Sequence, residues 1–181
     1  MKFSENWLRA LTHVAADRAD LMHRLTMAGL EVEGVDVLGE GLDGVVIGEI
    51  TEAEKHPNAD KLRVCKVAVG SGEPLQIVCG APNARVGLKA PLATIGATLP
   101  NGIAIKQAKL RDLDSFGMLC STRELGLSDD HAGLMELPAD APVGQAFATW
   151  IGLPDASIEI KLTPNRPDCL SLRGLAAEVT A

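Results

Sequence analysis

Near the N-terminus, apolar residues recur three and four positions apart, which is the spacing of a helix with one buried face. Ser4 can cap a short helix that carries Trp7, Leu8 and Leu11. A second helix is predicted to begin at about Asp17 and to end at Gly29, with apolar positions at Leu21, Met22, Leu25 and Ala28. Val32, Val35 and Val37 then predict a short strand.

From about residue 42 the pattern changes to short apolar and β-branched runs separated by turn-forming residues. The predicted strands are Val45–Ala53, Leu62–Val69, Leu75–Val78, Lys89–Ile95 and Ile103–Ala108. Gly70–Glu73 predicts a hairpin turn between the second and third of them. Five short strands with long, irregular connections favour an OB-type barrel over a sandwich.

The last segment returns to an α+β pattern. Ile158, Ile160 and Leu162 alternate as in a strand, and the turn Pro164–Asp168 leads into an amphipathic helix. That helix reaches Ala181 without a capping residue, which predicts a piece of a longer protein. The expected regions are therefore 1–40, 41–150 and 151–181.

Composition narrows the class of protein. Hydrophobic residues make up 46% of the 181, which predicts a globular chain. No apolar run is long enough for a membrane span, and residues 1–6 lack the apolar core of a signal peptide, so a cytoplasmic location is expected. Cys65, Cys79, Cys120 and Cys169 are widely spread, which predicts reduced, buried thiols and no metal site.

Charge is distributed unevenly along the chain. The net formal charge is −7, but residues 45–111 carry nine basic and five acidic residues and are positive. Both flanks are acidic, with four basic and eight acidic residues in 1–44 and four and eleven in 112–181. A basic segment of this kind is where contacts to nucleic-acid phosphates are expected, although ordinary solvated surface charges remain the alternative.

Motifs for catalysis are missing from the sequence. There is no G-x-S-x-G, no P-loop and no calcium-binding loop, and no serine lies in a motif with a histidine. His56 precedes a proline and is interpreted as structural. No catalytic residue, metal or cofactor is therefore predicted for these 181 residues.

Several motifs carry a family resemblance over nearly the whole chain. They are His56–Leu62 (HPNADKL), Ile77–Asn83, Lys109–Arg111, Ser115–Ser121, Met1–Leu8, Thr26–Glu33 and Leu162–Ser171. The central motifs resemble the tRNA-binding domain appended to several aminoacyl-tRNA synthetases. The flanking motifs resemble the start of the β subunit of bacterial phenylalanyl-tRNA synthetase. Asp112, where relatives often have Gly, and Phe116, where a polar residue is usual, depart from the pattern.

The resemblance implies a mainly β chain, with a five-stranded OB-fold barrel inserted into a small discontinuous α+β domain. It also implies an α₂β₂ enzyme that joins phenylalanine to tRNA-Phe using ATP and Mg²⁺, with the aminoacylation site on the α subunit. Two alternatives stay open. One is a module for assembly of the synthetase without RNA binding of its own, and the other is a free-standing tRNA-binding protein. An exposed apolar patch on the flanks would favour the first.

The candidate RNA contacts follow from the basic segment and the OB-type groove. Lys61 and Arg63 are two apart on a strand and should share a face. The full candidate set is Lys55, Lys61, Arg63, Lys66, Asn83, Arg85, Lys89, Lys106, Lys109, Arg111 and Ser121. Since the barrel region holds few aromatic residues for stacking, recognition of structured RNA through its backbone is expected.

Overall fold

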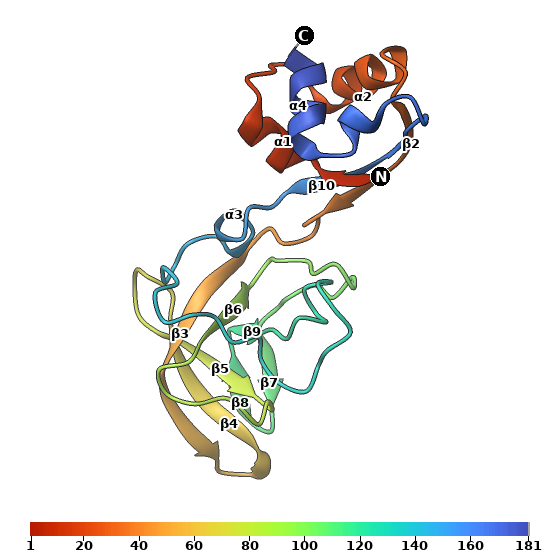
Figure 1. Cartoon of the computed structure of the whole chain (residues 1–181). Coiled ribbons are helices and arrows are strands. Elements are labelled where there is room, and N and C mark those ends of the chain that lie inside the picture. The colour runs from red at the N-terminus through yellow and green to blue at the C-terminus, as the bar shows by residue number, and fades with distance from the viewer. Residues whose placement is uncertain (181) are drawn as a thin grey trace. The chain divides into compact units, whose positions relative to one another are not determined.

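The computed structural model describes residues 1–180, which form two compact units (Figure 1). The flanking unit comprises residues 1–38 and 154–180, and the barrel unit comprises residues 39–153. Each unit has its own hydrophobic core. None of the helices formed by residues 1–180 has both the length and the apolar character needed to cross a membrane.

The flanking unit is built on a three-stranded antiparallel sheet. Its strands are β1 (Lys2–Ser4), β10 (Asp155–Lys161) and β2 (Glu31–Leu38), with β10 in the middle. Its helices are α1 (Glu5–Leu11), α2 (Arg18–Met27), the 3₁₀ turn η1 (Pro167–Cys169) and α4 (Leu172–Thr180). Ala156, Ile158 and Ile160 of β10 are buried in the same core as residues of these helices, so both ends of the chain contribute to one core.

Local capping explains where the first two helices begin. The Ser4 hydroxyl accepts the backbone N–H of Trp7, at 3.1 Å, and the Asp17 carboxylate accepts that of Asp20, at 2.8 Å. These contacts confirm both predicted helix starts. The expected apolar face of the first helix was wrong in part, because only Leu8 is buried, while Trp7 is 70% and Leu11 57% exposed.

The barrel unit contains a five-stranded antiparallel sheet. Its strands are β3 (Val45–His56), β4 (Ala59–Ala68), β5 (Leu75–Cys79), β6 (Lys89–Thr94) and β9 (Gly117–Leu119), in the order β5-β4-β3-β6-β9. β5 also lies against β9, so the sheet nearly closes into a barrel. This confirms the mainly β chain with a five-stranded OB-type barrel and α+β flanks. A short helix, α3 (Phe147–Trp150), completes the unit, with Phe147 fully buried and Trp150 partly buried.

The fifth strand was predicted at Ile103–Ala108, and that prediction was wrong. Ile103 is exposed, and the backbone N–H of Ile105 binds the Ala97 carbonyl within a local loop. The chain then forms a separate hairpin, β7 (Ala108–Leu110) and β8 (Leu113–Ser115), before β9 pairs with β6. β9 is only three residues long, which is too short to give an alternating pattern. A Cβ on Gly117 would lie 2.7 Å from the Ala93 carbonyl oxygen, so this strand approaches β6 closely.

Candidate nucleic-acid interface

Two hairpin turns meet at one end of the barrel unit. The turn between β3 and β4 carries His56, whose side chain is buried. The Nε2 atom of His56 lies 3.2 Å from the carbonyl oxygen of Leu110, next to the turn between β7 and β8. In an OB-fold, the loop after the first strand and the loop before the fifth commonly bind oligonucleotides. These two turns occupy those positions in the chain.

Five candidate cations lie on the two hairpins that meet at His56. We call them the hairpin-tip cluster: Lys55, Lys61, Arg63, Lys109 and Arg111. Lys55 and Arg63 are direct cross-strand neighbours, and Lys61 lies in the irregular stretch between them and the turn. All but the half-buried Arg63 are exposed. Within residues 1–180 none of the five forms an ion pair, so their charges are available to a polyanion.

Arg63 also lies close to the barrel interior. It pairs across the sheet with Cys79. Burial raises the pKa of the Cys65 thiol to about 11 and also raises the pKa of the Cys79 thiol, and the positive charge of Arg63 opposes this effect at both. Arg63 and Cys65 are two residues apart on β4 and share one face of the strand. Arg63 is therefore the member of the hairpin-tip cluster that lies next to the inner face of the barrel.

Two further cations are placed differently. Lys66 lies one residue beyond Cys65, on the opposite face of β4, where its Nζ contacts the Gln76 side chain at 3.4 Å. Lys106 is exposed, lies in the long connection before β7 and lines a pocket together with Leu110. Of these two, Lys106 is thus the one adjacent to the hairpin-tip cluster.

Three other candidates hold the barrel unit together. Asn83 exchanges hydrogen bonds with the backbone of Leu134, at 2.8 and 3.0 Å. Arg85 makes a bidentate ion pair with Glu136, at 2.7 and 2.8 Å. The Nζ of Lys89 donates to two backbone carbonyl oxygens, those of residues 139 and 141, at 2.6 and 2.7 Å. The structure thus engages Asn83, Arg85 and Lys89 in binding the 134–141 segment.

Ser121 is buried and makes local contacts. Its backbone N–H donates to Glu124 Oε2 at 2.6 Å, and its hydroxyl donates to the same oxygen. Both donors of Ser121, which was predicted as an RNA contact, are therefore occupied within the protein. Glu124 was not among the predicted site residues, although the S-x-x-E spacing of a capping box was a signal for it.

The turn that presents Arg111 has an unusual backbone. Arg111 has a φ of 48° and Asp112 a φ of 74°, both in the left-handed region. Two consecutive residues of this kind between paired strands form the tight hairpin turn that Asn-Gly or Asp-Gly sequences prefer. The turn therefore explains why a Gly would suit position 112, and it places an acid beside Arg111.

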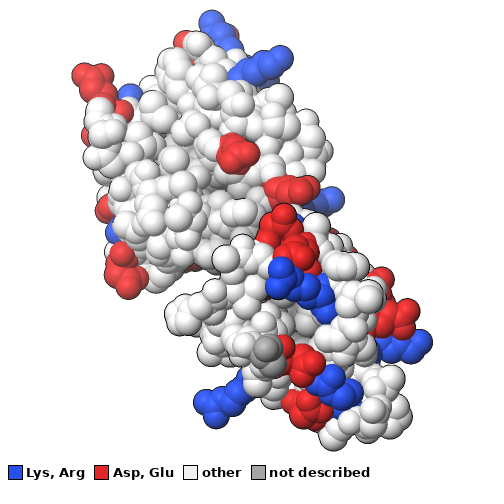
Figure 2. Space-filling model, turned by 90° about the horizontal axis from the view of Figure 1, so that it is seen from above, with Lys and Arg blue, Asp and Glu red and all other residues white. Residues whose placement is uncertain are grey.

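Outside the hairpin-tip cluster, positive and negative side chains lie close to one another. On the face shown in Figure 2, basic and acidic side chains are interspersed and large areas carry neither. Most cations of the flanking unit are paired, including Lys2 with Asp36, Arg24 with Asp20, and Arg166 with Glu178. The hairpin-tip cluster differs from this arrangement because none of its cations forms an ion pair in the described part of the chain, although Asp114 lies opposite Lys109 in the β7–β8 hairpin.

One cluster in the flanking unit has the composition of a metal site. Ligand atoms of Asp168, Cys169 and Glu178 lie within 4.8 Å of one another. Arg166 contacts all three, with its guanidinium 2.9 Å from Asp168 Oδ2 and 2.7 Å from Glu178 Oε2. Arg166 therefore supplies the positive charge that a metal ion would bring to these three groups. Its hydrogen bond lowers the pKa of the Asp168 carboxyl to about 2.

One protein-family model matches residues 45–146 of the chain. The matching family model is described as "Putative tRNA binding domain", and the match covers more than half of the chain. It includes β3 to β9, all five cations of the hairpin-tip cluster and the six other candidate residues.

Individual relatives extend the similarity to both units. The chain is 61% identical over 181 residues to the phenylalanine–tRNA ligase beta subunit of Aromatoleum aromaticum, and 56% identical over 179 residues to that of Methylococcus capsulatus. These matches cover 100% and 99% of this chain, but the chain spans only 23% of the length of each relative. Among solved structures, a MetRS related protein from Pyrococcus horikoshii matches with a TM-score of 0.41 and 24% identity, over 55% of this chain and 84% of that chain.

Proposed function

Because the chain belongs to the tRNA-binding domain family through residues 45–146, we propose that its barrel unit binds tRNA. The observation that carries this proposal is the hairpin-tip cluster, five cations that form no ion pair within residues 1–180, on two hairpins joined by the His56 contact. Such a cluster can neutralise RNA phosphates and release the counterions bound to them, which is the main source of affinity in non-specific nucleic-acid binding.

The remaining candidates receive different roles in this proposal. Lys106 extends the positive surface of the hairpin-tip cluster, whereas Lys66 lies on the other face of β4 and contacts Gln76. Asn83, Arg85 and Lys89 support the surface by fixing the 134–141 segment against the barrel. Ser121 shapes the loop in which Glu124 lies.

The test is the affinity of the 181-residue chain for tRNA as a function of salt concentration. We expect the dissociation constant to rise steeply with salt. We also expect the double variant Lys61→Glu, Lys109→Glu to lower the slope of log Kd against log salt by about 1.5, as for two lost phosphate contacts. Both side chains are exposed, so the fall in melting temperature should be small and should come from the like charge that Lys109→Glu places opposite Asp114.

A matched control carries the same change of charge in the flanking unit. Lys161→Glu combined with Arg173→Glu replaces two exposed cations there, and we expect this variant to keep the wild-type slope. If both double variants weaken binding equally, the loss reflects net charge and the assignment to the hairpin tips fails. Absence of tRNA binding by the wild type at low salt would overturn the proposed function.

For the whole protein we propose the role of a phenylalanine–tRNA ligase beta subunit, on the basis of 56–62% identity to such subunits along the chain. In this proposal the barrel unit is a domain inserted at residues 41–150 between the halves of an α+β domain, 1–40 and 151–181. The protein would act in the cytoplasm in an α₂β₂ assembly with an alpha subunit. Attachment of phenylalanine to tRNA-Phe, with ATP and Mg²⁺, would be carried out by parts other than these 181 residues.

A second function, assembly of the synthetase, is favoured by an apolar groove on the flanking unit. The groove has a volume of about 500 Å³ and is lined by residues including Phe3, Trp7, Leu38 and Leu170. Trp7 is 70% and Leu170 65% exposed, which is unusual for side chains of this size. In the full-length protein, Trp7→Ser with Leu170→Ser should reduce co-purification of the alpha subunit while tRNA binding by the barrel unit persists. Unchanged recovery of the alpha subunit would exclude this role.

A further inference from the structure

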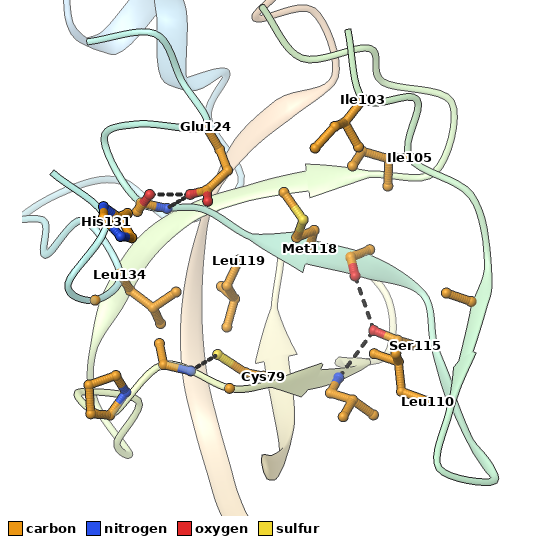
Figure 3. Close-up of a pocket in the computed structure, with 18 of the residues that line it drawn as sticks. Cys79, Ile103, Ile105, Leu110, Ser115, Met118, Leu119, Glu124, His131 and Leu134 are labelled. Carbon is orange, nitrogen blue, oxygen red and sulfur yellow. Dashed lines mark hydrogen bonds between the residues drawn. The ribbon is translucent and has the colours of Figure 1, made fainter. Parts of the chain in front are cut away.

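The barrel unit contains a pocket that the tRNA-binding assignment does not explain. It has a volume of about 520 Å³ and lies where the end of β5, the strand β9, the connection before β7 and residues 131–134 come together (Figure 3). Its walls are largely apolar and include Ile103, Ile105, Met118 and Leu134. A space of this size and character can enclose a flat organic ring.

Glu124 brings a carboxylate to the wall of this pocket, on the side where His131 also lies (Figure 3). Its Oε2 atom accepts both donors of Ser121. Within residues 1–180, no hydrogen bond or ion pair engages the other oxygen, Oε1. The contacts of Oε2 fix the orientation of the side chain, so Oε1 is a positioned acceptor for a ligand.

The charge of Glu124 determines the kind of group that can enter. A carboxylate repels a phosphate and accepts N–H donors, so the part of a ligand that reaches Glu124 must be neutral or basic. Lys106 also lines the pocket, and Leu110 connects it to the hairpin-tip cluster. A ligand with a flat amino-bearing ring at one end and a phosphate at the other fits this arrangement of charges.

We propose that the pocket takes one unpaired nucleobase of the bound RNA, with an exocyclic amine donating to Glu124 Oε1. The proposal rests on the proposed tRNA-binding function and adds a preference among bases. Cytosine and adenine present an amine on the edge used in pairing, whereas uracil presents carbonyl oxygens on either side of its ring N–H. Cytosine and adenine should therefore bind better than uracil. The contact needs no aromatic stacking partner, in keeping with the few aromatic residues of the barrel unit.

The test compares oligocytidylate and oligouridylate hexamers, which have equal charge and length. We expect the wild-type chain to bind the cytidylate about fivefold more tightly, the effect of one hydrogen bond. In Glu124→Gln, the amide oxygen can still accept the Ser121 N–H, so the amide N–H₂ would face the pocket. This variant should fold normally and lose or reverse the preference, because its new donor suits a uracil carbonyl. Lys106→Gln, the control, should weaken both hexamers equally.

Two results would overturn the proposal while leaving tRNA binding intact. They are equal affinity of the wild-type chain for both hexamers, and a cytidylate preference that Glu124→Gln retains. If the chain binds neither the hexamers nor tRNA at low salt, the proposed function is overturned and the pocket assignment fails with it. Salt-dependent tRNA binding measured in parallel distinguishes these cases.

Discussion

The Nε2 atom of His56 lies 3.2 Å from the carbonyl oxygen of Leu110, a contact between two hairpins 54 residues apart in the chain. The other ring nitrogen, Nδ1, accepts the backbone N–H of Asn58 at 3.1 Å. A nitrogen that accepts carries no proton, so a neutral ring protonated at Nε2 satisfies both contacts, with Nε2 donating to Leu110. One buried side chain thus orders its own turn and holds the β7–β8 hairpin beside it.

Two substitutions separate these contacts. His56→Gln can place an amide nitrogen near the position of Nε2 and keep the bond to Leu110, whereas His56→Asn can keep only the acceptor for the Asn58 N–H. We expect hydrogen exchange of the amides in residues 108–115 to be faster in the Asn variant than in the Gln variant. The affinity for tRNA should be lower in the Asn variant than in the Gln variant, because Lys109 and Arg111 lie on that hairpin. Equal exchange in the two variants would show that the Leu110 contact does not hold the hairpin.

Position 112 allows backbone strain and charge to be tested separately. Asp112 adopts a φ of 74°, which glycine tolerates without the steric cost of a side chain. We expect Asp112→Gly to increase the free energy of unfolding by about 0.5–1 kcal/mol. It should also tighten tRNA binding, since an acid beside Arg111 is removed. Asp112→Asn removes the charge but keeps a side chain, so it should tighten binding with little gain in stability. The free energy of unfolding is measured with urea. A lower value for the Gly variant than for the wild type would show that the backbone of Asp112 is not strained.

The features predicted correctly from sequence are those set by neighbouring residues. Ser4 and Asp17 cap helices through contacts three residues away, and such contacts can be read from the order of the residues. The first four barrel strands also follow from runs of adjacent side chains. The fifth could not be found in this way, because β9 is three residues long and depends on pairing with β6, more than 20 residues earlier.

The candidate site shows the same limit. Sequence identified the basic segment, but the groups that engage Arg85 and Lys89 are distant in the chain. Arg85 and Glu136 are 51 residues apart, so their ion pair gives no local signal. The β3–β4 turn and the β7–β8 hairpin, which carry the hairpin-tip cluster, are joined by the contact of His56 with Leu110, 54 residues apart. Sorting the cations into available and engaged ones therefore required the fold.

The four thiols provide a test of the cores. All four cysteines are buried, and burial raises the pKa of the Cys65 thiol to about 11 and that of Cys120 to about 12. A thiol that stays protonated and enclosed reacts slowly with disulfide reagents. We expect almost no reaction with Ellman's reagent in the native protein at pH 8, and four equivalents in denaturant. A rapid native phase would show that at least one of these cores opens readily.

The ion pair between Arg85 and Glu136 predicts a pH dependence of stability. Hydrogen bonds from Arg85 and Asn83 hold the pKa of Glu136 at about 2, well below the ordinary 4.5. When the native pKa is lower than that of the unfolded chain, the stabilisation is present above the unfolded pKa and is lost as the pH falls toward the native one. The contribution of this pair should therefore be complete above about pH 5 and should disappear between pH 5 and pH 2.

The comparison of wild type with Glu136→Gln isolates this pair from other acid-sensitive groups such as Asp168, because those are common to both proteins. We expect the wild type to have the higher melting temperature at pH 7, and the difference to shrink steadily from pH 5 to pH 2. The pair is exposed, so the difference should be modest and should decrease in high salt. Glu73→Gln, which replaces an exposed glutamate without an ion pair in residues 1–180, controls for the loss of one negative charge. A difference that does not change with pH would mean that Glu136 stabilises the 134–141 segment through its neutral contacts, and that its charge contributes little.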